Sequence, residues 1–173
     1  MNKIKFIDWF ENNLTVGGFP YRVNSRFDAS KYDIVINVSD EWYIDLEEQM
    51  REAGLKTYWF PMNEVKKDIG INSIYGAVVV LNRAEGRNQR VYLHCHMGVK
   101  RSEIIRSSYY FMRTNKQLVT DDATPNMLEE CCTNEYLPPL KEMESFLGNV
   151  ASHIKNMQGG ILDSCKLKSI TNF

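Results

Sequence analysis

Long hydrophobic runs are missing from this sequence of 173 residues, and runs such as AVVVL at 77–81 are far too short to span a membrane. The N-terminal stretch MNKIKFIDWFENN contains acidic and aromatic residues and lacks the apolar core and cleavage site of a signal peptide. The formal net charge is -1, so no overall positive field attracts nucleic acid or an anionic membrane. We therefore expect a cytoplasmic protein without a membrane span or a nucleic-acid partner, in which any anion site is built from local groups.

Cysteine pairs with the spacing of a metal site or a disulfide framework are also missing. The four cysteines are Cys95, Cys131, Cys132 and Cys165; none forms a CxxC pair, and the adjacent Cys131 and Cys132 make a poor disulfide framework. This usage fits a reducing compartment. The length, with 43% hydrophobic and 25% charged residues, fits one globular domain. We place the domain at residues 1–157 and a C-terminal tail at 158–173.

Apolar runs rich in strand-forming residues alternate with stretches of helical periodicity. The patterns predict strands at about 14–16, 33–39, 55–62 and 90–94. They predict helices at 40–54, 72–87, 102–115 and 138–157, with a short helix within 120–132. For the helix at 72–87, Asn72 or Ser73 is the expected cap and Gly86 the expected end. This order indicates an α/β fold: a single domain with a central, largely parallel twisted sheet flanked by helices on both faces.

The stretch VYLHCHMGVKRSEII, at 91–105, carries the chemistry. It joins a predicted strand to a predicted helix, and sites in parallel sheets form at the carboxyl ends of strands. Backbone N–H groups at a helix start, together with the helix dipole, bind anions. Gly98 allows the loop to curl, and the planar guanidinium of Arg101 can hold two phosphate oxygens at once. The stretch therefore predicts a phosphate site.

Cys95 lies at the base of this loop and is the candidate nucleophile. Surrounding N–H groups and the helix start favour its thiolate form, and a thiolate beneath a captured phosphate is placed for in-line attack on phosphorus. Ser102 follows Arg101 and can donate a hydrogen bond to the sulfur, which eases the later departure of that sulfur.

The run from His94 to Ser102 resembles the HC-x5-R-S signature of the protein tyrosine phosphatase superfamily, and the short chain suggests the dual-specificity branch. NLTVGGFPYR followed by YDIVINVSDE is similar to the opening strands of that branch. YWFPMNE followed by SIYGAVVVLNRAEGRNQRVYLHC looks like its acid loop, helix and nucleophile strand. The likeness covers roughly residues 13–115, and it implies the fold and mechanism of a cysteine phosphatase.

The resemblance also implies roles for individual residues. Cys95 would form a phosphocysteine intermediate, Arg101 would bind the phosphoryl oxygens, and His94 would order the loop without acting as a base. The substrate would be a phosphorylated protein or a small phosphoester, and neither a metal nor another cofactor would be needed. The backbone cradle would be formed by His96, Met97, Gly98, Val99 and Lys100.

The general acid is where the sequence departs from the family pattern. The family supplies this proton from an aspartate on a loop before the cysteine, and PMNEVKKD is the counterpart here. Asn63 is no acid, so the candidates are Glu64, which we prefer, and Asp68; a site with neither would turn over only substrates with good leaving groups. Glu103, at the start of the next helix, is a second departure, because its charge is unfavourable beside a phosphate unless it points away.

Several alternatives stay open at this point. His96 and Lys100 either favour a multiply anionic substrate, such as an inositol phosphate or a phosphoinositide, or simply face solvent. Cys131 and Cys132 either pack on a helix or form a disulfide with Cys95 on oxidation. Three further alternatives would replace the enzymatic interpretation of the site. His94 and His96 could be zinc ligands, Cys95 could be an inert buried cysteine, or the domain could bind phosphorylated partners with weak catalysis.

The aromatic residues Trp42, Tyr43, Tyr58 and Trp59 form a second group of interest. They can frame a pocket, and for Tyr58 and Trp59 the strand pattern favours packing in the core.

Overall fold

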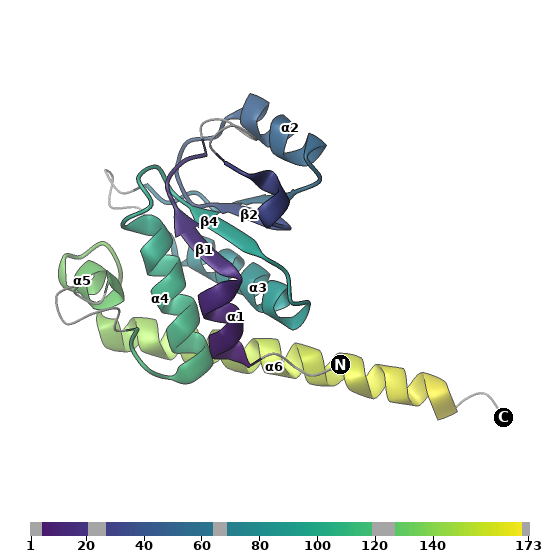
Figure 1. Cartoon of the computed structure of the whole chain (residues 1–173). Helices are drawn as coiled ribbons and strands as arrows, with labels where there is room; N and C mark the ends of the chain where they lie inside the picture. Colours follow the sequence, from purple (N-terminus) through teal and green to yellow (C-terminus); the bar gives the residue numbers. More distant parts are fainter. Residues whose placement is uncertain (1–4, 21–26, 64–68, 119–126, 171–173) are drawn as a thin grey trace.

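A four-stranded parallel sheet forms the centre of the computed structural model of the chain, with the strand order β1-β4-β2-β3 (Figure 1). The structure describes residues 5–20, 27–63, 69–118 and 127–170, and the side chains among them up to residue 157. The strands are β1 (Leu14–Gly17), β2 (Ile34–Asn37), β3 (Lys56–Trp59) and β4 (Val91–His94). The predicted strands are confirmed: β2, β3 and β4 are shorter than predicted, and β1 extends one residue further.

Helices cover both faces of the sheet, as expected. Alternation along β2 divides its side chains between two cores: Ile34 and Ile36 join the large one, and Val35 joins the small one. The small core also holds Met50 of α2 (Ile44–Glu52). The large core is built with α1 (Phe6–Asn12), α3 (Ile71–Gly86), α4 (Arg101–Thr114), α5 (Met127–Thr133) and α6 (Leu140–Ile170). The α/β fold class is thereby confirmed.

The helix at 72–87 forms with its predicted face buried, but its expected cap is wrong. Ile74, Val78 and Leu81 are fully buried. The N-cap of α3 is Gly70, which makes no side-chain capping bond. The hydroxyl of Ser73 instead donates to the carbonyl oxygen of Pro61 at 2.7 Å, so it ties the helix start to the segment that follows β3.

A polar clasp joins α3 to α4 on the side of the sheet away from α2. The carboxylate of Glu85 accepts two hydrogen bonds from the guanidinium of Arg113, at 2.6 and 2.8 Å, and a third from the hydroxyl of Tyr109. Burial and the neighbouring Glu85 raise the pKa of Tyr109, so its hydroxyl stays protonated as a donor. Two-point contact with an arginine fixes geometry as well as supplying energy.

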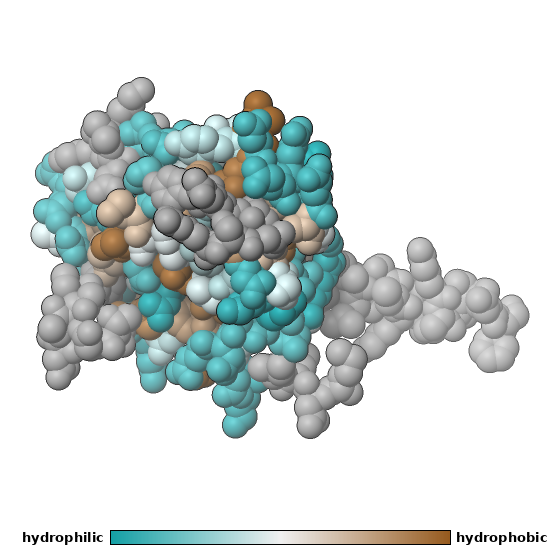
Figure 2. Space-filling view, turned by 45° about the horizontal axis from the view of Figure 1, so that its top comes forward, coloured by the Kyte–Doolittle hydropathy of each residue, from teal (hydrophilic) through white to brown (hydrophobic). Residues whose placement is uncertain are grey.

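The surface carries no single dominant apolar region on the described part of the face in Figure 2, where hydrophobic atoms appear in small groups among hydrophilic ones. Such mixing is ordinary, because apolar atoms contribute over half of a folded protein's surface. Among the described helices, none is both long enough and apolar enough to cross a membrane.

Candidate active site

The loop between β4 and α4 curls because Gly98 adopts a conformation that other residues avoid. Gly98 has a φ of 75°, and a Cβ added there would lie 2.5 Å from the backbone nitrogen of Gly18. A hydrogen bond of 3.0 Å from the backbone N–H of Phe19 to the carbonyl oxygen of His96 joins the same two segments. The loop is therefore pressed onto the end of β1, at the carboxyl edge of the sheet.

Polar groups surround the sulfur of Cys95. The backbone N–H of Gly98 donates to Sγ at 3.2 Å, and the hydroxyl of Ser102 lies 3.5 Å from it. Burial alone raises the pKa of Cys95, but the hydrogen bonds from Ser102 and Gly98 and the charge of Arg101 outweigh it and leave that pKa below 9.0. Cys95 is 2% exposed, yet it lines an open pocket of about 400 Å³. An inert structural cysteine is instead surrounded by apolar side chains and has no such polar neighbours.

Arg101 begins α4, and its guanidinium is held by the segments that follow β2 and β3. Its Nη1 donates to the carboxylate of Asp40 at 2.6 Å and to the carbonyl oxygen of Met62 at 3.0 Å. The side-chain amide of Asn63 donates to the other oxygen of Asp40 at 2.9 Å. The planar, five-donor shape of a guanidinium suits two-point contact with phosphate oxygens. The guanidinium is thus fixed beside the loop that holds Cys95.

Asp40 and Glu41 are the site residues that the sequence analysis missed. A helix was predicted over 40–54, but α2 begins only at Ile44, because the preceding residues form a turn. The side-chain oxygen of Asn37 accepts hydrogen bonds from the N–H and the hydroxyl of Ser39, at 2.8 and 2.7 Å. Asn37 also donates to the carbonyl oxygen of Glu41 at 3.0 Å. This side-chain turn competes with helix formation, and an Asn two residues before a Ser was the available signal.

His94 is buried directly before the cysteine. Its Nδ1 lies 3.3 Å from the carbonyl oxygen of Cys95, and its ring packs edge-on against Phe19. Burial lowers the pKa of His94 to about 4, so the ring is neutral near pH 7. A neutral, enclosed imidazole suits a role in ordering the loop.

Charged and apolar side chains of the loop form the rim of the pocket. Met97 and Val99 are 73% and 61% exposed. The Nδ1 of His96 lies 3.2 Å from the carboxylate of Glu41. The ammonium of Lys100 lies 4.2 Å from the centre of the Tyr136 ring. The two basic residues of the loop therefore have protein partners rather than water alone.

The candidate general acids Glu64 and Asp68 lie outside the described residues. Glu103 is described: its carboxylate pairs with Arg106 one helical turn further along α4, at 3.2 Å. The negative charge of Glu103, the second departure from the family pattern, is therefore paired with a positive charge on the same helix.

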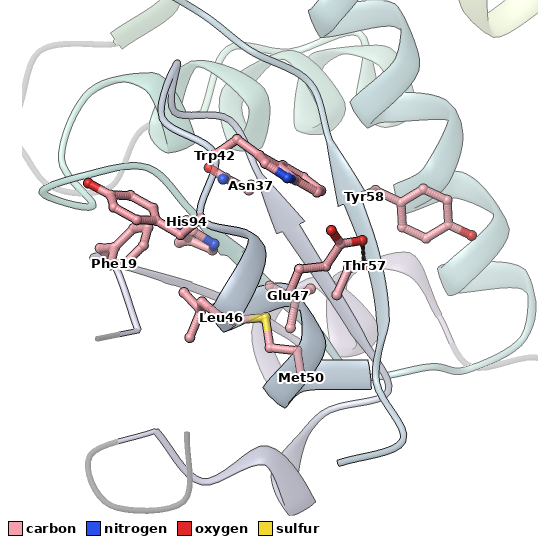
Figure 3. Close-up of a pocket in the computed structure, with 11 residues that line it drawn as sticks. Phe19, Asn37, Trp42, Leu46, Glu47, Met50, Thr57, Tyr58 and His94 are labelled. Atoms are coloured by element: carbon pink, nitrogen blue, oxygen red, sulfur yellow. Dashed lines mark hydrogen bonds between the residues drawn. The ribbon is translucent and has the colours of Figure 1, made fainter. Parts of the chain in front are cut away.

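A second, mainly apolar pocket lies between α2 and the sheet, and Figure 3 shows side chains that line it, among them Trp42, Tyr58 and His94. Tyr43 lines it as well. The expectation that Tyr58 and Trp59 pack in the core is wrong. Tyr58 is 36% and Trp59 38% exposed, because β3 is an edge strand with a neighbour on one side only. Trp59 instead packs against Trp42, with ring centres 4.8 Å apart.

Cys131 and Cys132 pack on a helix. Cys131 and Cys132 lie on α5, the first buried and the second partly buried, and neither forms a disulfide within the described chain. Burial raises the pKa of Cys132 to about 11. Across the described part of the chain, no group of three His, Cys, Asp or Glu side chains has the arrangement of a metal site.

No protein-family model and no curated protein matches this sequence, but solved structures resemble it in fold. PTPMT1 in complex with PI(5)P aligns with a TM-score of 0.60 and 13% identity, over 84% of this chain and 96% of its own. DUSP15 aligns with a TM-score of 0.57 and 13% identity, over 84% and 92%. The core catalytic domain of the PP-IP phosphatase SIW14 from S. cerevisiae, in complex with citrate, aligns with a TM-score of 0.54 and 18% identity, over 85% and 88%.

These structures belong to the protein tyrosine phosphatase superfamily, and this chain has the fold of that superfamily. The resemblance stated from the HC-x5-R-S run is confirmed at the level of the fold. At these identities the activity has to be argued from the chain's own site.

Proposed function

We propose that the protein is a metal-independent phosphomonoester hydrolase that acts through a phosphocysteine intermediate, with phosphotyrosine, phosphoserine or phosphothreonine proteins as its substrates. One observation carries the proposal: the sulfur of Cys95 accepts a backbone N–H at 3.2 Å, in a loop that ends at a helix N-terminus and at Arg101. Such a loop binds a phosphate dianion through N–H groups and a guanidinium while it keeps the sulfur ionised.

In the first step, the thiolate of Cys95 attacks phosphorus opposite the leaving oxygen. A sulfur–phosphorus bond forms as the phosphorus–oxygen bond to the leaving group breaks. Arg101 and the loop N–H groups stabilise the charge on the other phosphoryl oxygens. The leaving oxygen takes a proton from a carboxylic acid, for which Glu64 and Asp68 are the candidates.

In the second step, water attacks the phosphocysteine and displaces the sulfur. The carboxylate left from the first step accepts a proton from this water, and inorganic phosphate is released. The hydroxyl of Ser102, 3.5 Å from Sγ, and the N–H of Gly98 stabilise the departing thiolate. Electron pairs and protons balance over the two steps without a redox partner, and a reactive thiolate fits a reducing compartment such as the cytoplasm.

Hydrolysis of phosphoinositides or inositol phosphates is the second candidate. It is favoured by the fold neighbours, since one was solved with PI(5)P and another is described as a PP-IP phosphatase. A module that binds phosphorylated ligands with weak catalysis is the third candidate, because Asn63 stands in the loop where the family supplies its aspartate, and an amide cannot donate that proton.

Turnover of para-nitrophenyl phosphate in excess chelator tests the proposal. The wild type should release phosphate, and Cys95→Ser should reduce the rate to background while the protein stays folded. Cys132→Ser, in which a thiol outside the loop is replaced, should leave the rate unchanged. Equal rates for wild type and Cys95→Ser, or loss of turnover with chelator, would contradict the mechanism.

The general acid is identified by the leaving group. If Glu64 is the acid, Glu64→Gln should slow hydrolysis of an alkyl phosphate more than that of para-nitrophenyl phosphate, whose leaving group needs little protonation. Asp68→Asn should then have little effect. Equal sensitivity of both substrates in both variants would mean that neither carboxylate is the acid.

A further inference from the structure

Two consecutive carboxylates contact basic side chains in and directly after the loop between β4 and α4, residues 95–100, which we call the phosphate-binding loop. Asp40 contacts Nη1 of Arg101 at 2.6 Å, and Glu41 lies 3.2 Å from Nδ1 of His96. The side chain of Asp40 is 36% exposed and that of Glu41 45% exposed, so neither carboxylate is covered by its partner. Negative charge therefore stands beside a site for negative substrates.

The sheet brings these carboxylates to the loop. β2 lies next to β4 in parallel register, with Asn37 opposite His94, and the backbone N–H of Val38 donates to the carbonyl oxygen of His94 at 2.9 Å. The chain beyond Asn37 therefore runs beside the chain beyond His94. This places residues 40 and 41 against the phosphate-binding loop.

The turn that presents the two carboxylates is held from several sides. Beyond the bonds of Asn37, the hydroxyl of Ser39 donates to the carbonyl oxygen of Glu41 at 3.1 Å. The indole N–H of Trp59 donates to the carbonyl oxygen of Ser39 at 2.8 Å. The hydroxyl of Tyr43 donates to the Glu41 carboxylate at 2.9 Å. These contacts keep Asp40 and Glu41 beside the site when a ligand arrives, rather than letting them swing away.

Helix α5 adds another acidic group at the pocket. Glu130 of α5 lines the pocket together with Lys100, whose ammonium lies over the Tyr136 ring. Within the described residues, each basic side chain of the loop therefore has an acidic or aromatic neighbour at the rim. One phosphoryl group seated on the loop N–H groups and Arg101 is stabilised, whereas further phosphates on the same ligand face carboxylates.

We propose that Asp40 and Glu41 are specificity-determining residues that make the site select ligands with a single phosphoryl group over ligands with clustered phosphates. The inference rests on the proposed phosphatase function and narrows it, since it favours a monophosphorylated side chain over an inositol polyphosphate. Repulsion between like charges a few ångströms apart near a protein surface is large enough to change relative affinity by about tenfold.

The test compares two ligands of the same site by competition. Inorganic phosphate and inositol hexakisphosphate are used as inhibitors of para-nitrophenyl phosphate turnover, and the ratio of their inhibition constants is the measured quantity. Glu41→Gln and Asp40→Asn should each shift the ratio by about tenfold in favour of inositol hexakisphosphate. Asp40→Asn also removes a contact that holds Arg101 and so weakens the binding of both ligands. For this reason the ratio of inhibition constants, and not the turnover rate, tests the inference.

Asp33→Asn is the matched control. Asp33 precedes the other end of β2 and pairs with Arg90 at 3.0 Å, so the variant removes an equivalent charge and an arginine contact far from the loop. Its ratio should equal that of the wild type. An unchanged ratio in both Glu41→Gln and Asp40→Asn, or a wild type that already prefers inositol hexakisphosphate, would overturn the inference.

Failure of the inference is separable from failure of the function. Wild-type turnover that depends on Cys95, with an unmoved ratio, leaves the phosphatase function standing and removes the role of the two carboxylates. If the protein shows no turnover, the proposed function fails. The ratio of dissociation constants for phosphate and inositol hexakisphosphate, measured by calorimetry on the wild type and the three variants, then tests the inference.

Discussion

A Cβ on Gly98 would lie 2.4 Å from the carbonyl carbon of Gly17, closer than such atoms approach in proteins. The two glycines belong to different segments, one in the loop between β4 and α4 and one at the end of β1. Their close approach sets where the loop N–H groups point, including the one that Gly98 donates to the sulfur of Cys95.

Gly98→Ala should therefore inactivate the protein without unfolding it. The new methyl group meets backbone that cannot move aside, and the φ of 75° adds strain of about 1–2 kcal/mol. Displacing the loop by about 1 Å should lower kcat/KM at least about 100-fold. Gly148→Ala, on open surface within α6, should keep full activity and gain about 0.5–1 kcal/mol of stability. Near-normal kinetics in Gly98→Ala would mean that the loop tolerates another conformation.

Ser102→Ala should slow the release of the sulfur more than its attack. The hydroxyl stabilises a thiolate, and a hydrogen bond to a charged group contributes about 1.5–3 kcal/mol. We expect kcat to fall about 10- to 100-fold, with a burst of product in rapid-mixing experiments as phosphocysteine accumulates.

The matched control is Ser108→Ala on the same helix. Ser108 is also buried, but its hydroxyl has no hydrogen-bond partner within the described chain, so removing it should leave kcat unchanged. Equal decreases of kcat and kcat/KM in Ser102→Ala, without a burst, would assign the hydroxyl to the attack step instead.

The strands and the longer helices were predictable because their signals are local. Ile34 and Val35 alternate between two cores, and Ile74, Val78 and Leu81 recur at helical spacing, so period alone identifies each element. α1 was not predicted, since it has only seven residues and its support is distant. Trp9 of this helix donates its indole N–H to the carbonyl oxygen of Gln89 at 2.9 Å, a contact that no local pattern reveals.

The site was predictable along one segment only. The residues from His94 to Ser102 are contiguous, so their spacing predicts their proximity once a strand and a helix flank them. Asp40 reaches Arg101 through the pairing of β2 with β4, and strand order is decided by the whole sheet. Asn63 was set aside as no acid, and its contact with Asp40 depends on the same arrangement.

Cys95 should be alkylated at neutral pH well before Cys132. Only the thiolate reacts, and it is lost below the pKa of the thiol. Because the pKa of Cys95 is lowered from 9.0, its alkylation rate should begin to fall at a lower pH than that of an ordinary thiol. Cys132 should react quickly only as the pH approaches its pKa of about 11. Peptide mapping after brief iodoacetate treatment at several pH values measures both. Inorganic phosphate should protect Cys95 and leave Cys132 unaffected; protection of neither, with equal rates, would place Cys95 outside an anion site.

His94 should make the fold sensitive to mild acid. Its pKa is about 4 in the folded protein and near 6.5 when unfolded, so the unfolded state binds the extra proton between these values. The free energy of unfolding is therefore unaffected above pH 6.5 and falls as the pH drops toward 4. Since one pH unit corresponds to about 1.4 kcal/mol, the loss should reach about 3 kcal/mol.

Urea unfolding at several pH values between 7 and 4 measures this loss. His94→Asn removes the titrating group, so this variant should lose about 3 kcal/mol less than the wild type over that range, whatever its stability at pH 7. His153→Asn, which changes an exposed histidine on α6, should follow the wild-type curve. Parallel curves for His94→Asn and wild type would show that the ring takes up a proton as readily in the folded protein as in the unfolded chain, and His94 would then add a positive charge behind the loop in mild acid.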